Sequence, residues 1–468
     1  MRNKRFIRCI SAVLCGVMLL SVCSCGRDEK AAETIKIEPM EAETAYAYSF
    51  DFIGGTDVMP ITGYNGPSAS DNSMNGVAIP DYVTDEIFSM IAECGLNFLA
   101  HTNTDYKQAP QYVDKMMELG EKYGIGIVVR DSAITDEVDL KFMDARVNEY
   151  RDYPAFCGVY VVDEPCIESY YYTAGRTISD FANRMNNLGE LGVWTYGNLF
   201  PLYDANKRDT YDAYLEEWLT TCDVKMLMWD HYVHDKSGHT KVDYFYNLAI
   251  CREKAEKYKL PFWTYIQSGS QWNDSHIKFD TDGYYPNEGE FLWNVNTCLA
   301  YGAKGIAYFP LIQPYHFAYA ESQPYDFERN GLIGASGNKN RWWYYAQIAN
   351  QQIAAIDEVL MNSVNKGVIV TGSKAKIDNA DSTCIIEGNA WRELTGISGD
   401  TMVGCFNYQG KSAYYVVNYD MEYAQEITLE FYDNCNFTVT QKAETSKLQG
   451  EGITLTMAPG EGVLVVME

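Results

Sequence analysis

Short apolar runs alternate with amphipathic stretches from about residue 55 to residue 362, which limits the chain to few architectures. An expected strand precedes an expected helix eight times, as an eightfold β/α barrel requires. The strands are near-continuous apolar runs, typical of parallel strands buried on both faces. The expected strands cover residues 58–64, 97–102, 125–131, 156–164, 192–199, 224–232, 261–268 and 302–311. The expected helices cover about 84–95, 111–124, 137–152, 168–187, 210–221, 243–258, 288–301 and 341–361.

A doubly wound open sheet is the competing architecture for this alternation. That fold binds dinucleotides through a glycine-rich turn after its first strand, and no such turn follows residues 58–64. We therefore expect an α/β protein with a (β/α)8 TIM barrel over residues 51–363. From about residue 365, short alternating runs are separated by Gly, Asn and Asp, which predicts an antiparallel β-sandwich domain over residues 364–468.

The N-terminus has the pattern of a secretory signal peptide over residues 1–25. A basic segment, MRNKRFIRC, precedes the apolar run ISAVLCGVMLLSV, which is too short for a comfortable membrane span. The following SVCSCG resembles a bacterial lipobox, so we expect lipidation at Cys25, with ordinary cleavage as the alternative. Residues 26–50 then form a flexible tether. The expected location is extracytoplasmic and membrane-anchored, at the cell surface or in the periplasm.

Charge and cysteine usage exclude several classes of protein. A net charge of −27 provides no basic stripe to neutralise phosphates, so no nucleic-acid partner is expected. Nine scattered cysteines follow the signal without a CxxC pair, which favours buried free thiols over disulfides or a zinc site. No metal-ligand spacing, phosphate-binding loop or serine nucleophile elbow is present, and we expect neither a metal nor a cofactor.

The stretch GVYVVDEP (158–165) ends the fourth expected strand with two adjacent carboxylates. In a barrel of this type, reactive residues lie at the carboxyl ends of the strands. Neighbouring carboxylates repel each other, so one pKa is expected to rise, which suits a general acid at neutral pH. Glu164, outside the strand, is the candidate acid, and Asp163 positions it or contacts substrate. A polar strand end facing water is the alternative interpretation.

Other strand ends supply carboxylate, amide and aromatic side chains. Together they suit hydrolysis of a glycosidic bond, which needs one protonated carboxyl and one ionised carboxylate around a sugar. Asp230, after the sixth strand, is the third catalytic candidate. The expected substrate contacts are Tyr64, Asn198, Trp229, Tyr232, Tyr265, Gln267, Trp272 and Tyr308.

Two stretches carry a resemblance to a known family. GVYVVDEP resembles the acid/base strand of clan A glycoside hydrolases, in which a Glu follows Asn or Asp at the end of the fourth strand. EFLWNVNTCLAYGAKGIAYF (290–309) resembles the last helix–strand unit of bacterial β-galactosidase-like barrels. The resemblance implies a hydrolase of poly- or oligosaccharides with Glu164 as acid/base. It also implies a nucleophilic Glu at the end of the seventh strand, where this chain has Gln267, an amide that cannot attack an anomeric carbon.

Three choices for the second carboxylate stay open. MLMWDHY resembles the Met-x-Tyr-Asp strand of family 18-type chitinases, in which the N-acetyl group of the substrate is the nucleophile. This resemblance implies that Asp163 and Glu164 serve in the same way, with Asp230 as the orienting residue. Asp230 could instead activate water in an inverting reaction. Glu288 and Glu290 form the third choice, although acids are favoured in any first helical turn. The absent seventh-strand Glu also supports a rival function, an inactive barrel that holds glycan for a neighbouring transporter or enzyme.

Overall fold

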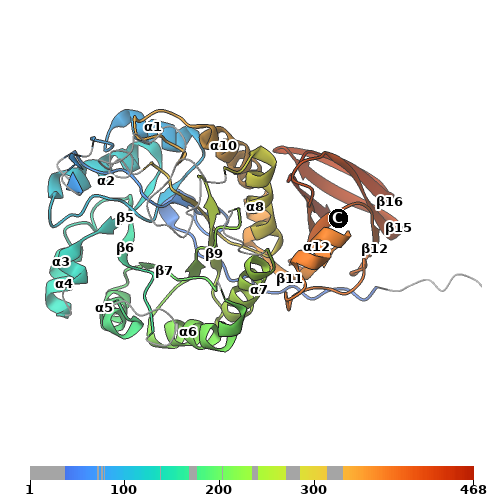
Figure 1. Ribbon diagram of the computed structural model, residues 1–468, viewed down its shortest axis with the longest axis horizontal. Coiled ribbons are helices and arrows are strands. Elements are labelled where there is room, and N and C mark those ends of the chain that lie inside the picture. The colour runs from blue at the N-terminus through green and yellow to red at the C-terminus, as the bar shows by residue number, and fades with distance from the viewer. Residues whose placement is uncertain are drawn as a thin grey trace, which may run out of the picture. The chain divides into compact units, whose positions relative to one another are not determined.

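The computed structural model describes residues 37–70, 80–136, 139–167, 176–202, 204–234, 241–269, 285–313 and 330–468. It also describes the backbone of two short strands, β2 (Ser73–Met74) and β3 (Val77–Ala78). Residues Glu38–Glu468 form one compact unit. Within it, a parallel α/β portion precedes an antiparallel β portion along the chain (Figure 1).

Eight short strands of the first portion pair in parallel and form two four-stranded sheets. One sheet has the order β4 (Phe98–Leu99), β5 (Gly126–Arg130), β6 (Phe156–Asp163) and β7 (Thr195–Asn198). The other has the order β1 (Ile61–Gly63), β10 (Ile306–Phe309), β9 (Phe262–Gln267) and β8 (Leu227–Trp229). Each of these strands lies inside one of the eight stretches expected from the sequence, so that part of the prediction is confirmed.

Backbone hydrogen bonds also link the edge strands of the two sheets. Just after β7, the Leu199 N–H donates to the Met228 carbonyl at 3.0 Å. Between β1 and β4, the Asn97 N–H donates to the Ile61 carbonyl at 3.2 Å. These contacts follow the order of the chain, because each strand meets the next one along the sequence.

Helices surround the parallel strands (Figure 1). Their bounds are α1 (Asp85–Glu93), α2 (Pro110–Tyr123), α3 (Ser132–Thr135), α4 (Leu140–Val147), α5 (Ile178–Glu190), α6 (Arg208–Thr221), α7 (Lys241–Tyr258), α8 (Glu288–Ala300), α10 (Arg341–Ala354) and α11 (Asp357–Met361). Single-turn 3-10 helices occupy η1 (Asp51–Ile53) and η2 (Ala205–Lys207).

Two helices predicted from the sequence differ in extent from the observed ones. The described part of the stretch 137–152 contains α4 only, with α3 before that stretch, because Asp131 and Asp139 each cap a new helix with their side chains. The stretch 341–361 divides at Ile356, whose backbone is not helical. The expected helix over 168–187 begins at Ile178 in α5, and residues 168–175 lie outside the described part of the chain.

The chain changes to antiparallel pairing at β11 (Ser363–Val370). The strand order is β11, β13 (Thr401–Tyr408), β14 (Lys411–Asn418), β17 (Gly462–Met467), β15 (Gln425–Gln441) and β12 (Leu394–Ile397); β16 (Glu444–Met457) pairs with β15, and α12 (Ser373–Asp378) follows β11. The register of β15 against β16 shifts between Glu430 and Cys435, so the two halves of β15 pair with different strands, β12 and β17. The expected antiparallel β domain is confirmed.

Helix α8 connects the two portions. Eleven of its thirteen residues are buried. Its Asn296 donates from Nδ2 to the Gly460 carbonyl at 2.8 Å and accepts from the Tyr415 hydroxyl at 2.7 Å. One side of α8 therefore contributes to the interface with the antiparallel domain, which explains why this helix is buried nearly all round.

Residues 38–50, assigned to the flexible tether on sequence grounds, contact both portions. Phe50 is buried and stacks on Phe98 with 4.4 Å between ring centroids. Asn407 of the antiparallel domain donates to the Glu41 carbonyl at 2.8 Å. A tether could therefore involve only residues that precede this packed segment.

The described cysteines agree with the expectation of free thiols. All nine are free, and seven of them are buried. Among the described residues, no group of three His, Cys, Asp or Glu side chains is arranged to hold a metal ion. None of the helices in the described ranges is both long and apolar enough to cross a membrane.

Candidate active site

Three carboxylates lie at the carboxyl ends of neighbouring parallel strands. β6 ends at Asp163, Glu164 follows it, and Asp230 follows the end of β8. Asn198, the last residue of β7, lies between them, and its Nδ2 donates to Asp163 Oδ1 at 3.2 Å and to Asp230 Oδ1 at 3.3 Å. One amide group thus holds together carboxylates from the strands on either side.

Glu164 leaves the strand in an unusual backbone conformation. Its φ of 50° lies in the left-handed region, which non-glycine residues seldom adopt, and its N–H donates to the Asn198 carbonyl at 2.9 Å. Inside a strand, Asp163 and Glu164 would point to opposite faces. Because the strand has ended, both can act on the same site. Such conformations collect at functional sites.

Glu164 and Asp230 differ in pKa, and this difference separates their roles. Burial, together with the negative charges of Asp230 and Asp163, raises the pKa of Glu164 to about 9, while Arg176 opposes the rise. Burial and the charge of Asp163 raise the pKa of Asp230 to about 7, against the hydrogen bond from Asn198. Glu164 therefore holds a proton at neutral pH, and Asp230 loses its proton first of these two.

Asp163 is the carboxylate best supported as an anion. Burial raises the pKa of Asp163 above its ordinary value, and hydrogen bonds from Tyr64 and Asn198 and the charge of Arg176 oppose that rise. The Tyr64 hydroxyl donates to Asp163 Oδ2 at 2.7 Å, and Arg176 donates to the Asp163 backbone carbonyl. The Tyr64 ring stacks on His101 with centroids 3.7 Å apart. Asp163 is thus fixed on several sides, as its predicted positioning role requires.

Aromatic side chains line the interior next to these carboxylates. Tyr64, Tyr232 and Tyr265 were expected there, and the structure places all three in one cluster of packed side chains. The sequence ranking did not select Tyr160 or Phe309, which belong to the same cluster. Tyr160 lies three residues before the end of β6, across a register shift between Tyr160 and Val162, so simple alternation does not identify it. Phe309 is the last residue of β10 and shares its face with Ala307 of the same cluster, which is the signal that could have identified it.

Two expected substrate contacts lie on the other face of their strands. Trp229 is fully buried and packs on Phe262, and Tyr308 donates its hydroxyl to Asn350 of α10 at 2.6 Å. Both belong to the core between strands and helices rather than to the interior cluster. The prediction that Trp229 and Tyr308 contact substrate is therefore wrong, because alternate residues of a strand face opposite sides.

Gln267 binds backbone groups rather than an open site. Its Oε1 accepts from the His234 N–H at 3.1 Å, and its Nε2 donates to the carbonyls of His234 at 2.7 Å and Gly269 at 3.0 Å. Both amide hydrogens are thus used, and the side chain is 1% exposed. Its role is to hold the backbone after β8 against β9, and the expected substrate contact is corrected accordingly.

The remaining acidic candidates lie at the start of α8. Glu290 accepts from the Asn287 N–H at 2.8 Å in a capping box, and Glu288 is exposed. A first-turn acid is therefore a sufficient explanation for Glu290. Trp272 and Cys25 lie outside the described residues.

No protein-family model matches the sequence, and no curated protein matches it. Among solved structures, a catalytic mutant of a GH42 β-galactosidase from G. stearothermophilus is similar with a TM-score of 0.53; it is 9% identical, and the match covers 91% of this chain and 99% of that chain. In fold, this chain resembles TIM-barrel glycoside hydrolases.

Two further matches have lower TM-scores. A β-galactosidase from the psychrophilic Marinomonas ef1 is 10% identical over 72% of this chain and 66% of that chain, with a TM-score of 0.45. A GH30 subfamily 8 xylanase from Clostridium acetobutylicum is 9% identical over 92% of this chain and 97% of that chain, with a TM-score of 0.43. At such identities the likeness concerns the fold, and an activity has to be argued from the site.

The raised pKa of Glu164 has a consequence for stability. In the unfolded chain this carboxyl ionises near its ordinary pKa of 4.5, whereas the folded protein keeps the proton up to about pH 9. Between these values the unfolded state binds fewer protons, so the free energy of unfolding falls as pH rises. Glu164→Gln carries no titrating proton, so we expect its Tm to exceed that of the wild type by roughly 2 °C or more near pH 8. The two should converge towards pH 4.5.

Thermal unfolding followed by circular dichroism across this pH range measures the difference. Glu288→Gln, at an exposed position of α8, is the matched control, and its Tm difference from the wild type should not grow with pH. A Glu164→Gln variant whose Tm difference from the wild type stays constant with pH would show that burial does not hold the proton on Glu164.

Proposed function

We propose that this protein is a glycoside hydrolase in which Glu164 is the general acid. The observation that carries the proposal is a half-buried Glu164 with a pKa of about 9 beside two other carboxylates, Asp163 and Asp230. Hydrolysis of a glycosidic bond needs a carboxylic acid to protonate the leaving oxygen and a carboxylate to stabilise or attack the anomeric centre. These strand ends supply both in one cluster.

Asp230 is the proposed second carboxylate. It interacts electrostatically with Glu164, and Asn198 holds it at 3.3 Å. Its pKa of about 7 leaves a large ionised fraction at neutral pH. As an anion it can remove a proton from water or orient an N-acetyl group of the substrate. Either role complements proton donation by Glu164. Asp163, held by Tyr64 and Asn198, keeps the local charge that favours the proton on Glu164.

The architecture proposed with this function is a closed (β/α)8 barrel over residues 51–363 and a β-sandwich over residues 364–468. The hydrogen bonds between the edge strands of the two parallel sheets support closure. We also propose a lipid anchor at Cys25 and an extracytoplasmic location, which rest on the signal pattern and the SVCSCG motif.

A second candidate function is glycan binding without catalysis. Gln267 occupies the strand end where clan A enzymes carry their nucleophile, and its amide is committed to the backbone of His234 and Gly269. In that case the carboxylates and the aromatic interior would bind sugar hydroxyls and C–H faces without turnover.

A screen of chromogenic aryl glycosides and of plant and host polysaccharides separates the two functions. It compares the wild type with Glu164→Gln and with the control Glu288→Gln. Hydrolysis that is lost in Glu164→Gln and kept in Glu288→Gln supports the hydrolase. Equal hydrolysis by all three proteins overturns the role of Glu164. Glycan binding by the wild type without hydrolysis of any substrate favours the binding function.

A further inference from the structure

A pocket of about 200 Å³ lies next to Asp163, between the ends of β5 and β6. Its polar lining consists of Arg130, Ser132, Thr135, Tyr160, Asp163 and Arg176. It is smaller than the roughly 300–1,000 Å³ pockets that hold drug-sized ligands, so it suits a single small unit such as one sugar ring. Because Asp163 belongs both to this pocket and to the carboxylate cluster, a ligand here lies next to the proposed reaction centre.

Two guanidinium groups line this pocket, and the charge of one of them, Arg176, also acts on Asp163 and Glu164. Arg176 donates to the Asp163 backbone carbonyl, and within the described ranges neither Arg176 nor Arg130 forms an ion pair with an acidic side chain. Each guanidinium has five N–H donors in a planar fork that matches a carboxylate. Most of these donors are free for a ligand.

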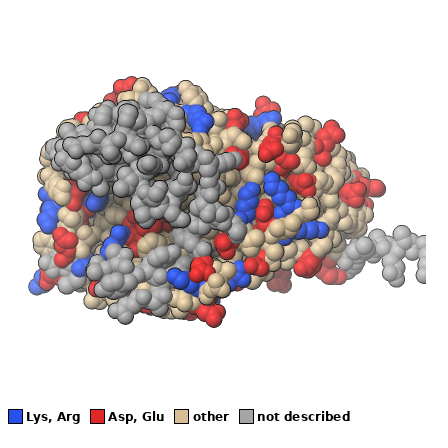
Figure 2. All heavy atoms as spheres, in the orientation of Figure 1, with Lys and Arg blue, Asp and Glu red and all other residues tan. Residues whose placement is uncertain are grey.

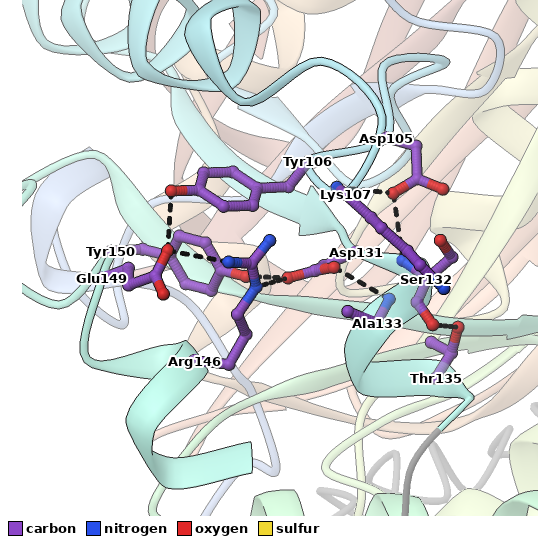
Figure 3. A network of polar contacts seen from close by, with 10 residues as sticks. All are labelled: Asp105, Tyr106, Lys107, Asp131, Ser132, Ala133, Thr135, Arg146, Glu149 and Tyr150. Carbon is purple, nitrogen blue, oxygen red and sulfur yellow. Dashed lines mark hydrogen bonds and ion pairs between the residues drawn. The ribbon is translucent and has the colours of Figure 1, made fainter. Parts of the chain in front are cut away.

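The neighbouring acid cannot neutralise Arg130, because it is already committed (Figure 3). Asp131 is fully buried and accepts from Arg146 Nε at 2.7 Å, from the Ala133 N–H at 2.9 Å and from the Tyr150 hydroxyl. Asp131 therefore fixes the turn from β5 into α3 and leaves Arg130 for another anion.

The same network also fixes the hydroxyl side of the pocket. Asp105 accepts from the Ser132 N–H at 3.1 Å and from the Lys107 N–H at 3.0 Å (Figure 3). Ser132 and Thr135 thus stand on a held backbone turn, one of the conditions for a preorganised binding site. The pocket has a rigid wall on the side of α3 and β5.

The two arginines of the pocket do not result from a generally basic surface. The chain carries a net charge of −27, and acidic and basic side chains are interspersed on the face shown in Figure 2. Two arginines in one pocket, neither of them in an ion pair within the described part of the chain, are a local exception to this acidic composition. The same net charge repels densely charged polyanions, so a ligand with a single negative group fits better.

The remaining lining identifies the rest of the ligand. Asp163 is an acceptor for hydroxyl groups, and Val161, Val162 and Phe181 supply an apolar part of the lining for the C–H side of a pyranose. Inorganic phosphate has no C–H face for the apolar part of this lining. We propose that the pocket binds a uronic acid residue of the glycan, with its carboxylate on Arg130 and Arg176. This inference rests on the proposed function, because it names the class of sugar that the same site takes.

Calorimetric titration of the full-length protein tests the proposal with two matched ligand pairs. The pairs are disaccharides ending in D-glucuronic or D-galacturonic acid and the methyl esters of the same disaccharides. The wild type is expected to bind at least one acid about 10- to 100-fold more tightly than its ester, the effect of charge-assisted hydrogen bonds. Arg130→Gln should remove most of this preference. Lys447→Gln, which removes an exposed positive charge from the antiparallel domain, should retain it.

Equal affinity of the wild type for acid and ester, no binding of either acid, or a preference unchanged in Arg130→Gln overturns the uronate site. Arg176→Gln gives a second reading of the same preference if Arg130→Gln is poorly folded. The titration needs no turnover, so its outcome is separate from that of the hydrolase. A preference for the acid without hydrolysis of any uronide supports the uronate site and contradicts the hydrolase function. Hydrolysis of neutral glycosides without such a preference supports the hydrolase function and contradicts the uronate site.

Discussion

Glu164→Gln lowers kcat/KM on glycosides with poor leaving groups by about 10²–10⁴-fold, the usual contribution of general acid catalysis. The substitution keeps the size of the side chain and removes the proton that Glu164 holds through its pKa of about 9. An alkoxide leaving group needs that proton, whereas a dinitrophenolate does not. We therefore expect a much smaller loss on dinitrophenyl glycosides. The measurement is kcat/KM over a series of aryl glycosides of decreasing leaving-group pKa.

The slope of that series distinguishes an acid from a residue that only shapes the site. Loss of an acid makes the rate of Glu164→Gln depend steeply on the leaving group, while the control Glu288→Gln should follow the wild type. A uniform loss over the whole series would mean that Glu164 binds substrate or supports the fold and does not donate a proton.

Asp230→Asn should cause a loss of similar size, about 10²–10⁴-fold, on both poor and good leaving groups. An amide neither activates water nor stabilises developing positive charge, and the need for a second carboxylate does not depend on the leaving group. The substitution also has an effect on pH dependence. The negative charge of Asp230 helps to raise the pKa of Glu164, so its removal lowers that pKa. The protonated acid is then lost at lower pH, and the alkaline limb of the kcat/KM profile should move down in pH.

The pH profile, measured on the residual activity with an activated substrate, reports this coupling. Added azide supplies a nucleophile in place of the lost one, and the anomeric configuration of the glycosyl azide product shows on which face Asp230 acts. An alkaline limb that does not move would indicate that Asp230 lies too far from Glu164 to act as its partner, and would return the search to other acids.

The order of strands and the main acids could be predicted from the sequence because both depend on local patterns. Eight apolar runs mark the parallel strands, and the strand end at Asp163 places Glu164 next to it. The bridging role of Asn198 could not be predicted. It depends on the register between β6 and β7, where Asp163 pairs with Asn198, and on the contact of β7 with β8.

The two wrong contacts have a common physical cause. Strands buried on both faces are apolar on both faces, so the sequence does not reveal which set of alternate residues points inward. The closeness of Trp229 and Tyr308 to strand ends predicts an interior position, yet both residues belong to the opposite set. Gln267 illustrates another limit, since only its neighbours in space show that its amide binds backbone groups.

Helix α8 also bears on how the protein can be divided. Its apolar surface belongs to two neighbours at once, and through Asn296 it bonds to residues of the antiparallel domain more than a hundred positions later in the chain. A chain ended near residue 363 would leave part of that surface, which the full-length protein covers, open to water and to other copies of itself. By covering this surface, the antiparallel domain keeps the half of the molecule that carries the carboxylates soluble.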